Sequence, residues 1–187
     1  MMMKLRLGVV LMAFVASAGV ATAKEPELTA VDSVELDRYL GEWYEIASYP
    51  AWFQRGCTAV TARYSLRDDG RIKVVNSCRK GSLDGKLKQS TGRAKVVDME
   101  TNAKLKVSFF GPFWGNYWII DLDPDYQWAV VGEPKRKYLW ILSRNRSMDD
   151  ETYESILDRL ENKGYDPDGL HRTLQPDPQA ESQVVGQ

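Results

Sequence analysis

The stretch Gly41-Glu42-Trp43-Tyr44-Glu45-Ile46 begins the first strand-like alternation in a chain of 187 residues. A short helical or turn segment is expected just before it, over residues 37–40. Side chains of a strand alternate between two faces. One face is therefore expected to hold Trp43, Glu45, Ala47 and Tyr49. A large apolar side chain on that face suggests a plug at the closed end of a curved sheet.

Seven more runs of apolar or β-branched residues follow, separated by turn signals such as Asp-Asp-Gly and Asp-Pro-Asp. They predict strands over residues 57–66, 71–80, 87–97, 104–110, 117–122, 126–132 and 138–143. Gly92 lies within one run and suggests a bulge or a bend there. Eight consecutive strands with short connections and no helix between them indicate an all-β fold, an antiparallel up-and-down β-barrel that is closed to remove its edges.

One amphipathic helix is expected after the last strand. Ser147-Met148-Asp149-Asp150 has the pattern of a capping box with Asp in place of Glu. An apolar stripe at helical spacing follows, formed by Tyr153, Ile156, Leu157 and Leu160. Gly164 is expected to end the helix. A single apolar face covers a single surface, so the helix is predicted to pack outside the barrel. Residues 170–174 are expected to add a short edge strand.

The N-terminal residues have the composition of a targeting signal. Lys4 and Arg6 precede an uncharged, largely apolar run over residues 7–20, and Ala21-Thr22-Ala23 is an A-x-A cleavage site. Cleavage between Ala23 and Lys24 removes two basic residues and no acidic one, which takes the formal charge from -1 to -3. The alternative is a start codon upstream of a cytosolic protein. No cysteine follows the apolar run, so no lipid-attachment site is expected.

With residues 1–23 assigned to the signal, residues 24–175 are expected to form one domain. Residues 176–187 are rich in Pro, Gln and Asp and are expected to be disordered. The nearly balanced charge implies neither nucleic acid nor an anionic surface as a partner. The many aromatic residues (6 Trp, 9 Tyr and 5 Phe) indicate a well-filled core or an aromatic-lined pocket.

Cys57 and Cys78 are the only cysteines. An even count in an exported chain indicates one disulfide. If the chain folds back at the turn over residues 67–70, the two cysteines come close together across a hairpin. The bond then closes a loop of about 20 residues, worth roughly 3 kcal/mol in the chain-entropy model. The spacing is far from C-x-x-C and no histidine cluster accompanies it, which disfavours a redox dithiol or a metal pair.

Three short motifs, in order, resemble the signatures of the lipocalin family: Gly41-x-Trp43-Tyr44, Asp121-x-Asp123-x-x-Tyr126 and Ile141-Leu142-Ser143-Arg144. The chain is most similar to bacterial envelope lipocalins, relatives of apolipoprotein D and plant temperature-induced lipocalins. That similarity rests on residues 64–70, 106–113 and 138–144 and covers about residues 34–175.

The resemblance implies an eight-stranded barrel that holds one small ligand. It assigns structural roles to Gly41, Trp43, Tyr44, Asp121, Tyr126 and Arg144, with the Arg144 guanidinium over the Trp43 ring. Such a desolvated contact is worth about 2 kcal/mol or more. Envelope lipocalins of this kind often carry a cysteine at the cleavage site, where this chain has Ala-Thr-Ala-Lys. A periplasmic or secreted protein is therefore expected, rather than an anchored outer-membrane one.

No catalytic, cofactor or metal motif is recognisable, so neither an enzyme nor a cofactor is expected. The single histidine, His171, has no nucleophile beside it. Glu45 shares a face with Trp43 and needs a partner if it is buried. That partner is an inward arginine, a bound water or the polar head of a ligand.

Two aromatic loops are expected at one rim of the barrel, because the loops after strands one and five lie at the same end. Ordinary loop packing is the alternative to an apolar collar that admits a ligand. Arg55 lies beside the first loop and suits a phosphate or a carboxylate. The candidate ligand contacts are Glu45, Tyr49, Trp52, Phe53, Arg55, Phe110, Phe113, Trp114 and Tyr117.

Together with these features, the resemblance implies a protein that carries or stores a fatty acid or a lysophospholipid in the bacterial cell envelope, with a role in membrane lipid turnover or maintenance. Burial of methylene groups, about 0.8 kcal/mol each, is the expected driving force. Transient contact with a membrane surface is expected, in a monomer or homodimer. The alternatives are a pigment, haem or another flat hydrophobe as ligand, an enzyme that acts on its bound ligand, and a protein-interaction module.

Overall fold

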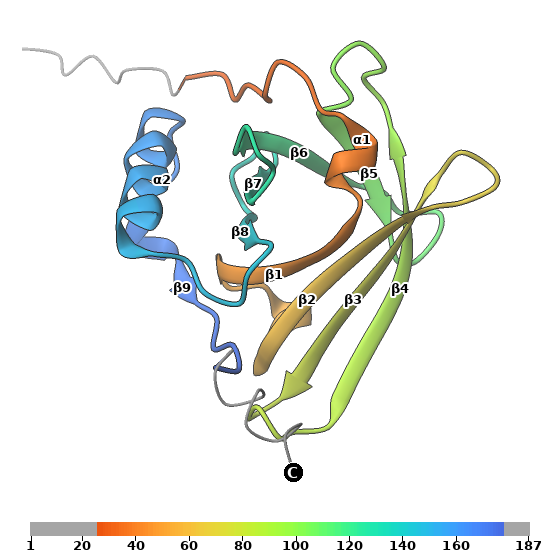
Figure 1. The fold of residues 1–187 in the computed structure, drawn as a ribbon. Helices are drawn as coiled ribbons and strands as arrows, with labels where there is room; N and C mark the ends of the chain where they lie inside the picture. Colours follow the sequence, from red (N-terminus) through yellow and green to blue (C-terminus); the bar gives the residue numbers. More distant parts are fainter. Residues whose placement is uncertain (1–25, 178–187) are drawn as a thin grey trace, which may run out of the picture.

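The computed structural model describes residues 26–177 and shows eight antiparallel strands wrapped into a closed barrel (Figure 1). The strands are β1 (Gly41–Ser48), β2 (Cys57–Leu66), β3 (Ile72–Lys80), β4 (Leu87–Val96), β5 (Lys104–Ser108), β6 (Gly115–Leu122), β7 (Trp128–Gly132) and β8 (Leu139–Ser143). Each strand pairs with the next, and β1 pairs with both β8 and β2. The predicted all-β barrel is confirmed. The predicted signal sequence and residues 178–187 of the predicted tail lie outside the described residues.

Short helices and one more strand complete the fold. They are α1 (Leu36–Tyr39), η1 (Trp52–Gln54), α2 (Asp150–Asn162), η2 (Pro167–Gly169) and β9 (His171–Arg172). Helix α1 lies at one end of the barrel and α2 lies outside its wall (Figure 1). Ile156 and Leu160 of α2 are fully buried against Val130 and Ile141 of the barrel's outer face, as the single apolar stripe predicts.

The cap of α2 differs from the predicted capping box. Asp149, not Ser147, is the N-cap residue, and its carboxylate accepts a hydrogen bond of 2.8 Å from the backbone N–H of Thr152. An N-cap side chain reaches the second or third helical N–H, so the cap is the residue three positions before Thr152. The C-terminal prediction is correct, because Gly164 follows the helix with φ +77°.

The prediction that Trp43, Glu45, Ala47 and Tyr49 share one face of the first strand is wrong, because β1 contains a bulge. The register of β1 with β8 shifts between Glu45 and Ala47. Trp43 therefore faces the interior, whereas Ala47 is fully buried in the outer cluster beneath α2. A bulge adds one residue to one strand and reverses the side chains that follow it. At Gly92, by contrast, the β3–β4 register is unbroken, so no bulge lies there. A side chain at Gly92 would meet the Phe109 ring at 2.8 Å.

The wall between β1 and β2 is completed by the C-terminal strap, defined here as residues 171–175. The direct β1–β2 register covers only residues 41–44 of β1. Beyond it, β9 pairs with Ala47 and Ser48. The Ala59 N–H donates to the Leu174 carbonyl at 2.7 Å. The Gln175 amide donates to the carbonyls of both Glu45 and Val60, at 2.8 and 2.9 Å. The predicted edge strand therefore also closes the barrel.

The closed end is formed by Trp43, which is fully buried. The Arg144 guanidinium carbon lies 3.7 Å from the centre of the Trp43 ring, the contact that the resemblance implies. Arg144 also donates to backbone carbonyls around it, those of Arg38 at 2.6 Å, Tyr39 at 3.3 Å, Leu40 at 2.9 Å, Glu42 at 2.8 Å and Tyr126 at 3.3 Å. The Trp43 indole N–H donates to the Tyr39 carbonyl at 2.8 Å. One arginine thus joins α1, β1 and β8 into a floor.

Candidate ligand-binding site

Four loops surround the end of the barrel opposite α1, namely residues 49–56, 81–86, 109–114 and 133–138. The two aromatic loops therefore share one rim, as the strand order predicts. Four aromatic side chains in them face solvent, with exposed fractions of 76% for Trp52, 42% for Phe53 and 78% for both Phe110 and Phe113. Packing within the loops therefore leaves these four aromatic rings largely accessible at one rim.

A row of aromatic rings leads from this rim into the barrel. Phe53 contacts Tyr138 at 5.8 Å between ring centres, and Tyr138 stacks on Trp140 at 5.8 Å. Trp140 belongs to the interior cluster. Tyr138 and Trp140 are absent from the contacts predicted from the sequence. The sequence feature that would have indicated them is the alternation over residues 138–143, in which Trp140 and Leu142 point to the same side of the strand.

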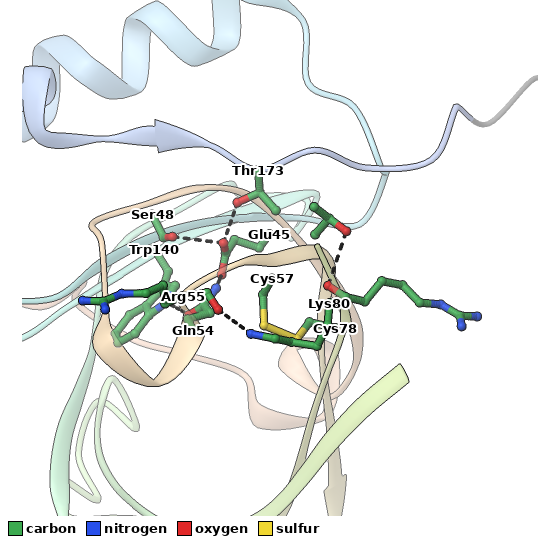
Figure 2. The surroundings of a disulfide bond; sticks show 11 residues. Glu45, Ser48, Gln54, Arg55, Cys57, Cys78, Lys80, Trp140 and Thr173 are labelled. Atoms are coloured by element: carbon green, nitrogen blue, oxygen red, sulfur yellow. Dashed lines mark hydrogen bonds between the residues drawn. A yellow bond between two sulfur atoms is a disulfide. The ribbon is translucent and has the colours of Figure 1, made fainter. Parts of the chain in front are cut away.

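Glu45 lies inside the barrel and is only 3% exposed. Its carboxylate accepts hydrogen bonds from Ser48 at 3.0 Å, from Thr173 at 2.5 Å and from Gln54 at 2.5 Å (Figure 2). Gln54 in turn accepts a hydrogen bond from the Trp140 indole at 3.3 Å. Burial raises the pKa of the Glu45 carboxyl, and the three hydrogen bonds partly oppose that rise. Glu45 thus joins β1 to the rim helix η1 and to the C-terminal strap through neutral donors.

Two predicted contacts lie outside the cup. The Tyr49 hydroxyl donates to the Asp166 carbonyl at 2.7 Å, and its ring meets Tyr165 beside the outer cluster. The centre of the Trp114 ring lies 5.4 Å from the Arg93 guanidinium carbon and 4.9 Å from the Lys95 ammonium nitrogen. Those two cations are on the outer face of β4, because Ala94 between them points inward. Neither Tyr49 nor Trp114 is therefore retained as a ligand contact.

Arg55 stands at the exposed rim beside a covalent crosslink. Its backbone carbonyl accepts a hydrogen bond from the Lys80 ammonium group (Figure 2). Cys57 and Cys78 form a disulfide directly below, with their Cα atoms 5.5 Å apart. Cys57 pairs in register with Lys80, two residues beyond Cys78, so both cysteines belong to one end of the β2–β3 hairpin. The crosslink holds the first rim loop against the third strand.

The floor of the cup is a cluster of three tyrosines from distant parts of the chain. The Tyr117 hydroxyl oxygen lies 2.7 Å from that of Tyr39 and 2.9 Å from that of Tyr64. Together they line a cavity of about 10 Å³ whose other walls are aliphatic, formed by Ile72, Val74, Ala94, Leu105 and Val107. Tyr117 is a predicted contact, whereas Tyr39 and Tyr64 are not. The Ala62–Tyr64 alternation in β2 is the signal that would have indicated Tyr64.

A closed barrel with a sealed floor, an apolar interior and an aromatic mouth is the architecture of a binding cup for one small hydrophobic ligand. The family model of the lipocalin-like domain matches residues 34–175. The chain belongs to the lipocalin family.

Relatives support this assignment along most of the chain. It is 46% identical over 139 residues to the outer membrane lipoprotein Blc of Escherichia coli K12, covering 74% of this chain and 78% of that protein. It is 40% identical over 170 residues to temperature-induced lipocalin-1 of Arabidopsis thaliana, covering 87% of this chain and 90% of that protein. It is 32% identical over 163 residues to mouse apolipoprotein D, covering 81% of this chain and 82% of that protein.

Solved structures agree on the fold. Insecticyanin from the tobacco hornworm Manduca sexta superposes with a TM-score of 0.65 at 21% identity, covering 81% of this chain and 86% of that one. Lobster apocrustacyanin A1 superposes with a TM-score of 0.59 at 20% identity, covering 80% of this chain and 85% of that one. Within residues 26–177, no helix combines the length and apolarity needed to cross a membrane.

Glu45 is predicted to make stability depend on pH. Its raised pKa means that the folded state holds this proton more tightly than the unfolded state, whose carboxyl titrates near 4.5. The contribution is therefore complete below about pH 4.5 and is lost as pH rises through the folded-state pKa. Glu45→Gln cannot ionise, so its free energy of unfolding should fall less than that of the wild type between pH 4.5 and 8.

Urea unfolding followed by tryptophan fluorescence at several pH values measures the difference. Glu154→Gln, an exposed position on α2, serves as the control and should follow the wild-type profile. Parallel profiles for Glu45→Gln and the wild type would show that the carboxyl has no raised pKa in the folded protein.

Proposed function

We propose that this lipocalin binds an acyl lipid, a fatty acid or a lysophospholipid, in the bacterial cell envelope. The observation that carries the proposal is the lining of the cup, which is aliphatic at its narrow floor and aromatic toward its mouth. Each methylene group buried there contributes about 0.8 kcal/mol, so a chain of ordinary length supplies ample driving force. The relative from Escherichia coli, an outer membrane lipoprotein, supports an envelope role.

The shape of the floor favours a slender chain over a flat macrocycle. The cavity among the three tyrosines measures about 10 Å³, and its walls come from α1 and from five strands, β2 to β6. That volume is close to the space of one water molecule, so the floor has no room for a planar ring system and at most accommodates the end of a chain. His171, the only histidine in the sequence, lies exposed on β9 and does not face the interior cluster. These features support an acyl ligand over haem.

The aromatic rim is proposed to make transient contact with a lipid surface. Exposed apolar side chains occur at both ends of the barrel, since Leu66 and Met99 at the closed end are 61% and 77% exposed. Charge distinguishes the two ends. The rim loops have more exposed cations than exposed acids, namely Arg55, Lys86, Lys135 and Lys137 compared with Asp84. The hairpin turns at the closed end have more acids than cations, namely Asp68, Asp69, Asp98, Glu100, Asp123 and Asp125 compared with Arg67 and Arg71.

This charge separation is concealed by the nearly balanced total. Aromatic side chains among cations suit the interface of an anionic bilayer, where the rings enter the head-group layer and the cations meet phosphates. The open end of the cup would then face the membrane from which the ligand comes. The proposed location remains the periplasm or the exterior, with the cleaved signal predicted at residues 1–23.

Titration with palmitic acid and with a palmitoyl lysophospholipid tests the ligand class. The wild-type protein should saturate at one ligand per chain, followed by quenching of its tryptophan fluorescence. A fluorescent naphthalene sulfonate probe, displaced by the lipid, provides a second readout. Haem, titrated in parallel, should give no Soret shift. Stoichiometric haem binding together with no lipid binding would overturn the proposal.

Vesicle sedimentation tests the rim separately. Trp52→Ala and Phe113→Ala should each weaken association with vesicles that contain phosphatidylglycerol by roughly tenfold, because each loses the burial of one large apolar side chain. Met99→Ala, an equally exposed apolar position at the closed end, is the matched control and should bind as the wild type does. Equal losses for Phe113→Ala and Met99→Ala would argue against a membrane-facing rim.

A further inference from the structure

Strands β3, β4 and β5 form one side of the barrel, and this side is strongly basic. The three strands contain no aspartate or glutamate and eight lysine or arginine residues, namely Lys73, Arg79, Lys80, Lys88, Arg93, Lys95, Lys104 and Lys106. Helix α2 packs against the opposite side of the barrel and has five acidic residues and one arginine (Figure 1). The protein therefore has a basic side and an acidic side, although its formal net charge is only -1.

Five of these cations point outward and form a surface that we define as the basic wall: Lys73, Arg93, Lys95, Lys104 and Lys106. Side chains alternate between the two faces of a strand. The residues that alternate with the five cations belong to the interior cluster, namely Ile72, Val74, Ala94, Val96, Leu105 and Val107. Two aromatic rings lie on the wall. The Trp114 ring lies near Arg93 and Lys95, and the centre of the Trp118 ring is 4.7 Å from the Lys104 ammonium nitrogen.

The basic wall places cations directly opposite cations. Lys73 pairs in register with Arg93, and Lys95 pairs with Lys106. Like charges directly opposite each other on neighbouring strands are destabilising. Within residues 26–177 none of these four side chains forms an ion pair, and the fifth cation of the wall lies near Asp98 in the β4–β5 turn. A negatively charged surface placed against the wall would relieve this repulsion.

The geometry points to the basic wall as a docking surface for an anionic lipid bilayer. The wall continues into the rim loop 109–114, which carries Trp114 together with the exposed Phe110 and Phe113. A bilayer takes aromatic rings into its head-group layer while its phosphates meet the cations. A nucleic acid, or the acidic face of α2 from a second copy, would neutralise the cations but leave Phe110 and Phe113 in water. Charge and apolar surface together therefore select the bilayer.

This inference rests on the membrane contact proposed for the rim and specifies how the barrel is oriented. The barrel lies inclined onto β3, β4 and β5, with loop 109–114 in the head-group layer and the acidic α2 turned away from the anionic surface. The rim loop 133–138 joins β7 to β8, the strands against which α2 packs, so it lies farthest from the lipid. A barrel standing upright on its rim would instead bring all four rim loops to the lipid equally.

Two double variants with the same change in charge distinguish these orientations. Lys95→Gln with Lys106→Gln should weaken binding to vesicles of phosphatidylcholine and phosphatidylglycerol by roughly thirtyfold, because each lysine near an anionic surface contributes about a factor of five. The matched variant, Lys135→Gln with Lys137→Gln in the rim loop 133–138, should lose at most about threefold. Sedimentation of the mature chain with vesicles measures both. Equal losses would indicate an upright barrel and overturn the inference, while contact at the rim stands.

Stability and self-association provide further readouts for the wall variant. Lys95→Gln with Lys106→Gln removes a directly opposed pair of cations, so its melting temperature should equal or exceed that of the wild type. Salt-dependent self-association of the wild type that this variant abolishes, without binding of the wild type to vesicles, would assign the wall to a second copy and overturn the inference. A wild type that binds palmitic acid but no vesicle would overturn both the wall and the rim contact, while ligand binding stands.

The orientation can also be measured in the wild type without any substitution. The ¹⁵N-labelled protein is bound to lipid nanodiscs that contain phosphatidylglycerol and a lipid carrying a gadolinium chelate. The amide resonances of β4, β5 and loop 109–114 should broaden, whereas those of α2 and loop 133–138 should remain sharp. Equal broadening of loops 109–114 and 133–138, with sharp resonances for β4 and β5, would overturn the inference. This measurement decides the orientation even if a wall variant does not fold.

Discussion

The Arg144 guanidinium lies on the Trp43 ring and holds the closed end of the barrel together. Trp43 closes one end of the barrel, and Arg144 covers it at 3.7 Å while donating to carbonyls around α1. This places Tyr39 of α1 against the Trp43 ring, with 5.1 Å between ring centres, and hence positions its hydroxyl group beside Tyr117. The same contacts therefore hold the closed end together and set the position of the Tyr39–Tyr117 hydrogen bond.

The second constraint is the place where the barrel wall lacks direct strand pairing. The bulge in β1 carries the strand away from β2, and the C-terminal strap fills the space between them. Glu45 lies at this junction, where hydroxyl and amide donors from β1, η1 and the strap converge on one carboxylate. A buried acid without a cation is costly to ionise, so the junction combines close packing with sensitivity to pH. Hydrogen bonds through Glu45 connect the rim helix η1 to the strap, and the Cys57–Cys78 disulfide lies beside the same rim loop.

Much of this architecture could be predicted from the sequence, because turns and alternation are local signals. The run over residues 57–66 coincides with β2, and the other predicted strands differ from the observed ones by a few residues at their ends. The β1 bulge could not be predicted, since it depends on pairing with two different neighbours. The tyrosine floor was also inaccessible, because Tyr39 and Tyr64 lie 78 and 53 residues from Tyr117 and meet only after the barrel closes. Exposed aromatics at the rim were predictable from loop parity, whereas the outward positions of Tyr49 and Trp114 were not.

We propose that the barrel holds one acyl lipid per chain. Native mass spectrometry of the protein purified from its host, followed by denaturing extraction of the bound molecule, tests it most directly. We expect a single adduct whose mass matches a fatty acid or a lysophospholipid, on a chain that begins at Lys24 and is 2 Da lighter than the reduced form because of the Cys57–Cys78 bond. A protein that carries a chromophore instead, or no adduct even after incubation with excess lipid, would contradict it.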